Sequence, residues 1–116
     1  MNRPQEHKLY ESRLAMGFTQ DEMAFLLGAS SGSRVSRYES FKRLPQLNMV
    51  MAYLAVHQRS LQDLFAGHYR DVAISVLERA RELRERVEAT GNDERKVELL
   101  NSMILVLERG LQEHDE

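Results

Sequence analysis

Small polar and basic side chains gather in one short stretch of the chain, between residues 30 and 45. The stretch contains one acid, Glu39, against four bases, Arg34, Arg37, Lys42 and Arg43, although the whole chain of 116 residues has a formal net charge of −2. Lysine and arginine bind phosphate groups, and arginine can also donate two hydrogen bonds to the edge of a guanine base. This local basic patch is therefore a candidate surface for binding nucleic acid.

Residues for other kinds of chemistry are absent or poorly spaced. The chain has no cysteine, which excludes thiol nucleophiles, and its four histidines lack the paired helical spacing of metal ligands. The serines of the basic stretch have no suitable base partner, and the glutamates between residues 78 and 88 alternate with arginines, as on a solvated helix face. We therefore expect that the protein is not an enzyme and that it binds no metal ion and no cofactor.

The spacing of apolar residues predicts that helices position the basic patch. Apolar residues recur at intervals of three and four, and no segment alternates in the manner of a strand. The first helix is expected over about residues 5–16, with Leu9 and Leu14 facing inward. The second begins with a capping box, in which Thr19 and Glu22 bond backbone N–H groups at the helix start, and it ends at Gly28.

A third helix is expected to begin after Ser31, which can cap it, and to extend to about residue 39. Val35 and Tyr38 are three positions apart and face inward together. At 100° per residue, the opposite side then carries small polar and basic residues, namely Ser33 and Arg37, with Arg34, Ser36 and Ser40 beside them.

Beyond the basic stretch the sequence predicts two shorter helices and then two long ones. The fourth helix has an expected inner stripe of Leu47, Val50, Met51 and Leu54, and Ser60 caps a fifth short turn that ends with Leu64 and Phe65. Two long amphipathic segments, at about residues 68–90 and 92–113, are separated by Gly91 and are expected to form a helical hairpin. The chain is thus expected to have two parts, residues 1–66 and 67–116.

The last helix carries two apolar surfaces. One steps by three and four residues through Val97, Leu100, Ile104, Leu107 and Leu111, and the other contains Leu99, Met103, Leu105 and Val106. A single neighbouring helix cannot cover both surfaces. Either this helix is buried centrally in one fold, or the second surface packs on another subunit. We favour a dimer, with Leu99, Met103 and Val106 in the dimer or partner interface.

A short capped helix, a glycine turn and a helix with a polar, basic outer face are the parts of a DNA-binding helix-turn-helix. At these positions the sequence resembles the XRE-type helix-turn-helix family, the Cro and phage-repressor-like regulators. The resemblance covers about residues 9–65 and rests on Gly17 to Ala24, Leu27, Gly28, Arg34 to Glu39, Arg43, Pro45 and Ser60 to Phe65. It implies an all-α fold, in which a five-helix lambda-repressor-like bundle precedes the two-helix C-terminal hairpin.

The resemblance also implies roles for particular residues. The third helix would enter the major groove, and Gln20, at the start of the second helix, would bind a phosphate. Ser33 and Arg37 would face base edges, Arg34 belongs to the same surface, and Ser31, Ser36, Lys42 and Arg43 would contact phosphate groups. Arg13 and Glu39 match a structural ion pair that joins the first helix to the third.

Three features depart from the family pattern. The segment from Gly28 to Val35 is one residue longer than usual, and we place the extra residue in the turn before Ser31. Phe41 replaces the glycine that usually ends the third helix, and Gly32 stands where many relatives carry a base-reading side chain. We therefore expect fewer direct contacts to bases, or a readout that is shared with DNA shape.

The sequence thus predicts a sequence-specific transcriptional regulator, a homodimeric repressor that binds double-stranded DNA at an inverted-repeat operator. Residues 1–66 would bind DNA and residues 67–116 would pair the subunits. The alternative is an antitoxin-like interaction module whose C-terminal helices bind a toxin or another protein antagonist, and a third possibility is an architectural DNA-binding protein. The polar start lacks a secretory signal and the longest apolar run is far below the ~20 residues of a membrane span, so we expect a cytoplasmic protein without a membrane partner.

Overall fold

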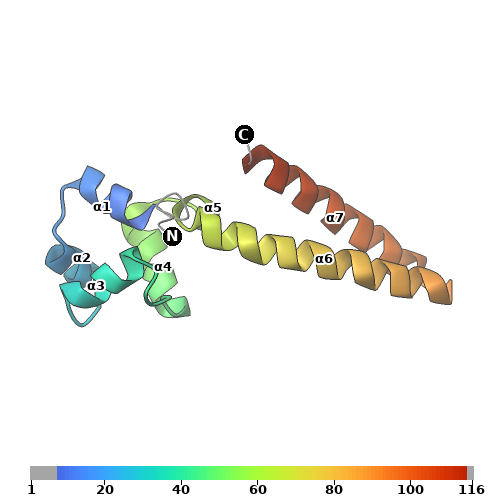
Figure 1. The fold of residues 1–116 in the computed structure, drawn as a ribbon, viewed down its shortest axis with the longest axis horizontal. Coiled ribbons are helices and arrows are strands. Elements are labelled where there is room, and N and C mark those ends of the chain that lie inside the picture. Colours follow the sequence, from blue (N-terminus) through green and yellow to red (C-terminus); the bar gives the residue numbers. More distant parts are fainter. Residues whose placement is uncertain (1–7, 115–116) are drawn as a thin grey trace. The chain divides into compact units, whose positions relative to one another are not determined.

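The computed structural model describes residues 8–114, and all regular structure in this range is helical (Figure 1). The expected all-α fold is therefore confirmed. In chain order the helices are α1 (Leu9–Met16), α2 (Gln20–Leu27), α3 (Gly32–Glu39), α4 (Leu47–His57), α5 (Leu61–Leu64), α6 (Ala66–Thr90) and α7 (Glu94–His114). Contacts within the chain divide it into two compact units between His68 and Tyr69.

The helix boundaries follow local capping chemistry. The Thr19 hydroxyl accepts a hydrogen bond from the Glu22 backbone N–H at 3.0 Å, while the Glu22 carboxylate accepts one from the Thr19 N–H at 2.9 Å. Ser31 and Ser60 cap α3 and α5 in the same manner. Gly28 ends α2 in the left-handed conformation, with φ of 75°. The capping box and these cap residues were predicted from the sequence, and they are confirmed.

The first unit is built around a core to which all of its helices contribute. Its buried residues include Leu9 of α1, Met23 of α2, Val35 and Tyr38 of α3, and Tyr53 of α4, with Leu64 and Phe65 from α5 and its C-cap. The Tyr53 ring packs edge-on against the rings of both Tyr38 and Phe65. Val35 and Tyr38 thus face inward, as predicted, and they orient the remaining sides of α3 outward.

Two predictions about buried residues are wrong. Leu14 is 50% exposed, whereas its neighbour Arg13 is buried, because an ion pair described below holds Arg13 inside the unit. In α4, Leu47 and Met51 are 72% and 57% exposed. The buried residues of α4 are Tyr53 and His57, because the aromatic rings of Tyr38 and Phe65 meet α4 on that side. Val50 and Leu54 of the expected stripe pack partly buried against the core.

The second unit is a hairpin in which α6 and α7 run antiparallel (Figure 1). Gly91, with φ of 68°, lies in the turn between them. Leu77 and Ala80 of α6 pack against Leu100 and Ile104 of α7, with Val87, Leu107 and Leu111 at the edges of this core. Arg81 forms an ion pair with Glu108, and Arg84 donates a hydrogen bond to Asn101 at 2.9 Å. No helix within the described residues is long and apolar enough to cross a membrane.

Candidate nucleic-acid interface

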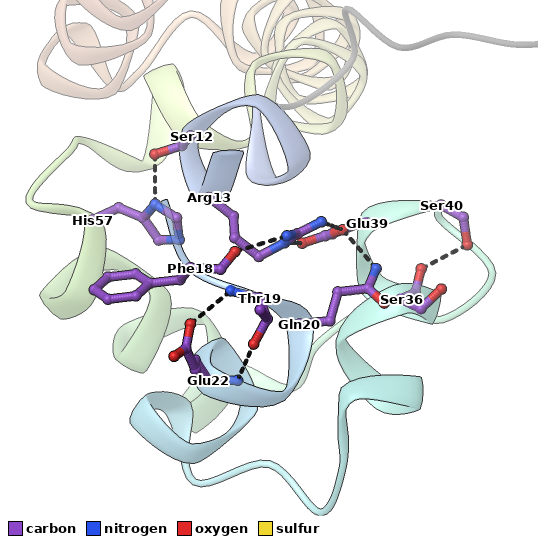
Figure 2. Close-up of polar contacts among 10 residues, drawn as sticks. All are labelled: Ser12, Arg13, Phe18, Thr19, Gln20, Glu22, Ser36, Glu39, Ser40 and His57. Carbon is purple, nitrogen blue, oxygen red and sulfur yellow. Dashed lines mark hydrogen bonds and ion pairs between the residues drawn. The ribbon is translucent and has the colours of Figure 1, made fainter. Parts of the chain in front are cut away.

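A buried ion pair fixes α3 against α1 (Figure 2). Arg13 Nε donates to Glu39 Oε2 at 2.6 Å and Arg13 Nη2 donates to Glu39 Oε1 at 3.1 Å. The side chains of Arg13 and Glu39 are only 8% and 5% exposed, and Arg13 Nη1 also donates to the Phe18 carbonyl at 2.9 Å. The hydrogen bond to Glu39 raises the pKa of Arg13 above its ordinary value. Both charges are thus paired, and the guanidinium links α1, the turn before α2, and α3.

Gln20 lies in the first turn of α2 and contacts the same carboxylate. Its amide Nε2 donates to Glu39 Oε1 at 3.1 Å (Figure 2). An amide nitrogen carries two protons, so this bond uses one of them and leaves the other available. The contact holds the N-terminal end of α2 beside the C-terminal end of α3.

The outward side of α3 borders a shallow hollow of about 630 Å³, here called the α3 hollow. The hollow is lined by Thr19, Gln20, Asp21, Gly32, Ser33, Ser36, Arg37, Ser40 and Lys42. Five of the eight residues expected to bind DNA are therefore brought together here, namely Gln20, Ser33, Ser36, Arg37 and Lys42. The other three lie outside its lining, with Ser31 and Arg43 exposed and Arg34 half-buried.

Gly32, where the family pattern would place a base-reading side chain, is buried and lies at the edge of the hollow. Its backbone N–H donates to Asp21 Oδ1 at 3.1 Å. Gly32 therefore packs against the first turn of α2. Sequence reasoning gave Asp21 no role beyond the family motif, because its contact partner lies eleven residues away across the turn.

Phe41 follows α3 and adopts the left-handed conformation itself, with φ of 63°. Its half-buried ring lies beside the His68 ring, with a centroid separation of 6.3 Å. After this turn, the backbone N–H groups of Lys42 and Arg43 donate to the Arg37 carbonyl at 2.9 and 3.3 Å. Phe41 thus itself adopts the left-handed conformation that glycine usually provides, and backbone bonds from both bases to Arg37 close the turn after α3.

A second buried polar cluster was not singled out from the sequence. Ser12 Oγ lies 2.6 Å from His57 Nδ1 (Figure 2), and the His57 ring stacks on Tyr53. Burial lowers the pKa of His57, with a smaller contribution from Arg59, and burial raises the pKa of Tyr53. These residues are absent from the lining of the α3 hollow. Within residues 8–114 no group of three or more histidines and carboxylates is placed to hold a metal ion.

Comparison with protein families gives a match to a helix-turn-helix family model that covers residues 9–64. These residues span α1 to α5 and include every residue that lines the α3 hollow. Comparison of the chain with curated proteins and with solved structures gives no match. Residues 9–64 therefore belong to the XRE-type helix-turn-helix family of DNA-binding transcriptional regulators.

Proposed function

We propose that the protein is a cytoplasmic, sequence-specific transcriptional repressor that binds an inverted-repeat operator as a homodimer, with α3 in the major groove. The observation that carries the DNA-binding surface is the α3 hollow, where the polar side of α3 meets the N-terminal end of α2. A helix N-terminus presents free backbone N–H groups and a partial positive charge, which favour a phosphate. The arrangement therefore suits a base-reading helix placed between phosphate contacts.

Within this surface, Arg37 is the residue that we propose for base reading. It is exposed and lies opposite the buried Val35 and Tyr38 on α3. Ser33 lies beside it in the lining of the hollow, and both would face base edges. The proposed phosphate contacts are Gln20, Ser31, Arg34, Ser36, Lys42 and Arg43. The free amide proton of Gln20 supports its assignment, because a phosphate oxygen can only accept a hydrogen bond.

A matched pair of substitutions tests these roles. A duplex would first be selected from a random pool by the full chain, and the affinity of each variant would be measured for this duplex and for a scrambled one. Arg37→Ala should weaken binding to the selected duplex by roughly 1–3 kcal/mol and relax base preference, whereas Lys42→Ala should weaken binding to both duplexes alike. Equal losses from the two variants on both duplexes would contradict the assigned roles.

The proposal of a dimer rests on an apolar face of the hairpin. On α6, the exposed Val72 and Val76 directly precede the buried Ala73 and Leu77, and Leu83 is also exposed. On α7 the exposed residues Leu99, Met103 and Val106 directly precede Leu100, Ile104 and Leu107 of the hairpin core. The same offset on two antiparallel helices points to the same side of the hairpin. These six residues, here called the hairpin face, therefore form one surface.

The polar residues of the hairpin support this geometry. Arg81 and Glu108 directly follow Ala80 and Leu107, which is the opposite offset, and they form an ion pair with each other. That contact places both residues on one side of the hairpin. The hairpin face must therefore lie on the other side.

The area of the hairpin face suits a second copy of the chain. Its six residues are 37–67% exposed. They present on the order of 500 Å² per chain, so pairing two copies would remove about 1,000 Å² from water, which is the lower bound of a specific interface. Two hairpins joined in this way would form a four-helix bundle. Residues 67–116 would then serve as the dimerisation region and residues 1–66 as the DNA-binding domain.

Sedimentation of the full chain tests the dimer. The wild-type chain should sediment as a dimer, and the double variant Leu83→Glu with Met103→Glu should sediment as a monomer. Leu105→Glu is the matched control. The sequence pattern grouped Leu105 with Leu99, Met103 and Val106, but Leu105, which is 48% exposed, directly follows the buried Ile104 and so lies away from the hairpin face. A monomeric wild-type chain, or equal dissociation by the control, would overturn the dimer. The hairpin face would then be assigned to a different protein, as in the antitoxin-like alternative.

A further inference from the structure

The first turns of α2 and α3 meet at one contact, between Asp21 and Gly32. Asp21 Oδ1 accepts a hydrogen bond of 3.1 Å from the Gly32 backbone N–H. Gly32 is the first residue of α3, so its N–H is one of the donors that lack a partner within the helix. The cap residue of α3, Ser31, uses its hydroxyl for the Arg34 N–H at 3.4 Å. Asp21 therefore supplies a second cap to α3 from a different helix.

The absence of a side chain at residue 32 is what permits this contact. A Cβ atom placed on Gly32 would lie 2.3 Å from Asp21 Oδ1 and 3.1 Å from the Asp21 backbone nitrogen. The first distance is far inside van der Waals contact, so any other residue would displace the carboxylate. Gly32 and Asp21 thus form a matched pair, which brings the backbones of the two helix starts close together.

The charge of Asp21 by itself works against the proposed function. Asp21 is exposed and lines the same hollow as Gln20, Arg37 and Lys42. A carboxylate there repels the phosphates of a bound duplex and lowers affinity for every sequence. A counteracting benefit must therefore come from its bond to α3, and a carboxylate near helix N-termini is electrostatically favourable.

From this geometry we infer that Asp21 is a positioning residue, which sets the orientation of α3 through Gly32 and thereby determines how well the bases are read. The inference rests on the proposed function, because it assumes that α3 reads DNA. Asp21 itself touches no base in this scheme. Its bond to Gly32 affects the ratio between specific and non-specific binding, whereas its charge lowers affinity for all sequences alike.

Two substitutions at residue 21 separate the bond from the charge. Asp21→Asn and Asp21→Ala remove the same charge, but only asparagine keeps an oxygen that can accept the Gly32 N–H. Both variants, in the full chain, would be titrated with the duplex selected by the wild-type chain and with its scrambled counterpart. Asp21→Asn should raise affinity for both and preserve their ratio. Asp21→Ala should lower the ratio by about fivefold, which corresponds to the loss of one helix-cap hydrogen bond.

Gly32→Ala provides an independent arm in which the charge of Asp21 stays in place. The added Cβ should displace the carboxylate and lower the ratio as Asp21→Ala does. The double variant of Asp21→Ala with Gly32→Ala should lose less of the ratio than the two single variants combined. Circular dichroism melting would establish that each variant is folded. The inference is overturned if Asp21→Ala preserves the ratio as Asp21→Asn does, or if Gly32→Ala leaves the ratio unchanged. A wild-type chain that selects no sequence from the pool would instead defeat the proposed function.

Discussion

At the scale of single residues, the carboxylate of Glu39 binds side chains from two other helices. It is nearly buried and accepts hydrogen bonds from Arg13 and Gln20. The cost of removing a partner therefore depends on the charge that is left behind. A buried pair adds little net stability over apolar residues of the same shape, but a single buried charge without its partner is strongly unfavourable.

Arg13→Ala should accordingly destabilise the protein by roughly 3–5 kcal/mol, because Glu39 would be left buried without a counterion. The control is Arg59→Ala, which removes an arginine from the more exposed pair with Asp63, where both side chains are more than 30% exposed. That variant should cost less than about 1 kcal/mol. Urea unfolding of both variants measures the difference, and similar costs would show that the Arg13 pair is not an effectively buried one.

His57 should make stability depend on pH. In the unfolded chain its pKa is near 6.5, and burial lowers that value in the folded protein. The unfolded chain therefore takes up a proton first as the pH falls, so stability is fully present above pH 6.5 and decreases below it. His57→Gln should reduce this decrease in urea unfolding measured above and below pH 6.5. The other histidines are unchanged in the variant, so an identical decrease in both proteins would rule out His57 as its source.

Single residues were predictable from the sequence where their environment is set by near neighbours. Thr19 and Ser31 cap helices that begin next to them, so their positions follow from a few residues. Leu14 was misjudged, and the contact made by Gly32 was not foreseen, because tertiary contacts decide both environments. The Arg13 ion pair takes the inward position expected of Leu14, and the Asp21 carboxylate fills the space beside Gly32.

At the scale of elements, two helix ends adopt the same left-handed conformation with different residues. Gly28 ends α2 with φ of 75°, and Gln58 ends α4 with φ of 54°. Glycine adopts this conformation without steric cost, whereas other residues lose about 1 kcal/mol. The two helix ends should therefore respond oppositely to exchange of these residue types.

Gly28→Ala should destabilise the protein by about 1 kcal/mol. No atom lies within 4 Å of an added Cβ, so the loss would come from backbone strain alone. Gln58→Gly should stabilise the protein by about 0.5–1 kcal/mol, because its side chain makes only one exposed hydrogen bond, to the Ala55 carbonyl. Thermal unfolding of the two variants would measure both effects. Changes of the same sign would contradict the assignment of strain to Gln58.

The elements themselves were largely predictable, and their orientation was less so. Helical spacing, cap residues and the turn at Gly91 are local signals, and they located the short helices and the hairpin. The buried side of α4 was partly misjudged, because Leu47 and Met51 have the apolar character of core residues yet lie on the exposed side. Only the packing of Tyr53 between Tyr38 and Phe65 determines which side of α4 enters the core.

At the scale of the whole molecule, a net charge of −2 conceals the local basic patch that we propose as the DNA-binding surface. The proposed phosphate contacts include the cations Arg34, Lys42 and Arg43 in each subunit. Each neutralised phosphate contributes ~0.9 to the slope of log affinity against log salt, so a dimer should show a slope of about −5. Lys42→Ala should make this slope shallower by about two units per dimer. Affinity titrations across a salt series test this, and a nearly salt-independent affinity would exclude the proposed surface.

The position of Glu39 has a consequence for how α3 moves. This carboxylate belongs to α3 but bonds a side chain from α1 and another from α2, so α3 cannot unwind without breaking contacts to both. Backbone amides in the three helices should consequently exchange their hydrogens with solvent through one shared opening event rather than by fraying of α3 alone. Under the proposed function, a helix held in this way would reach DNA already folded, and little ordering entropy would remain to be lost on binding.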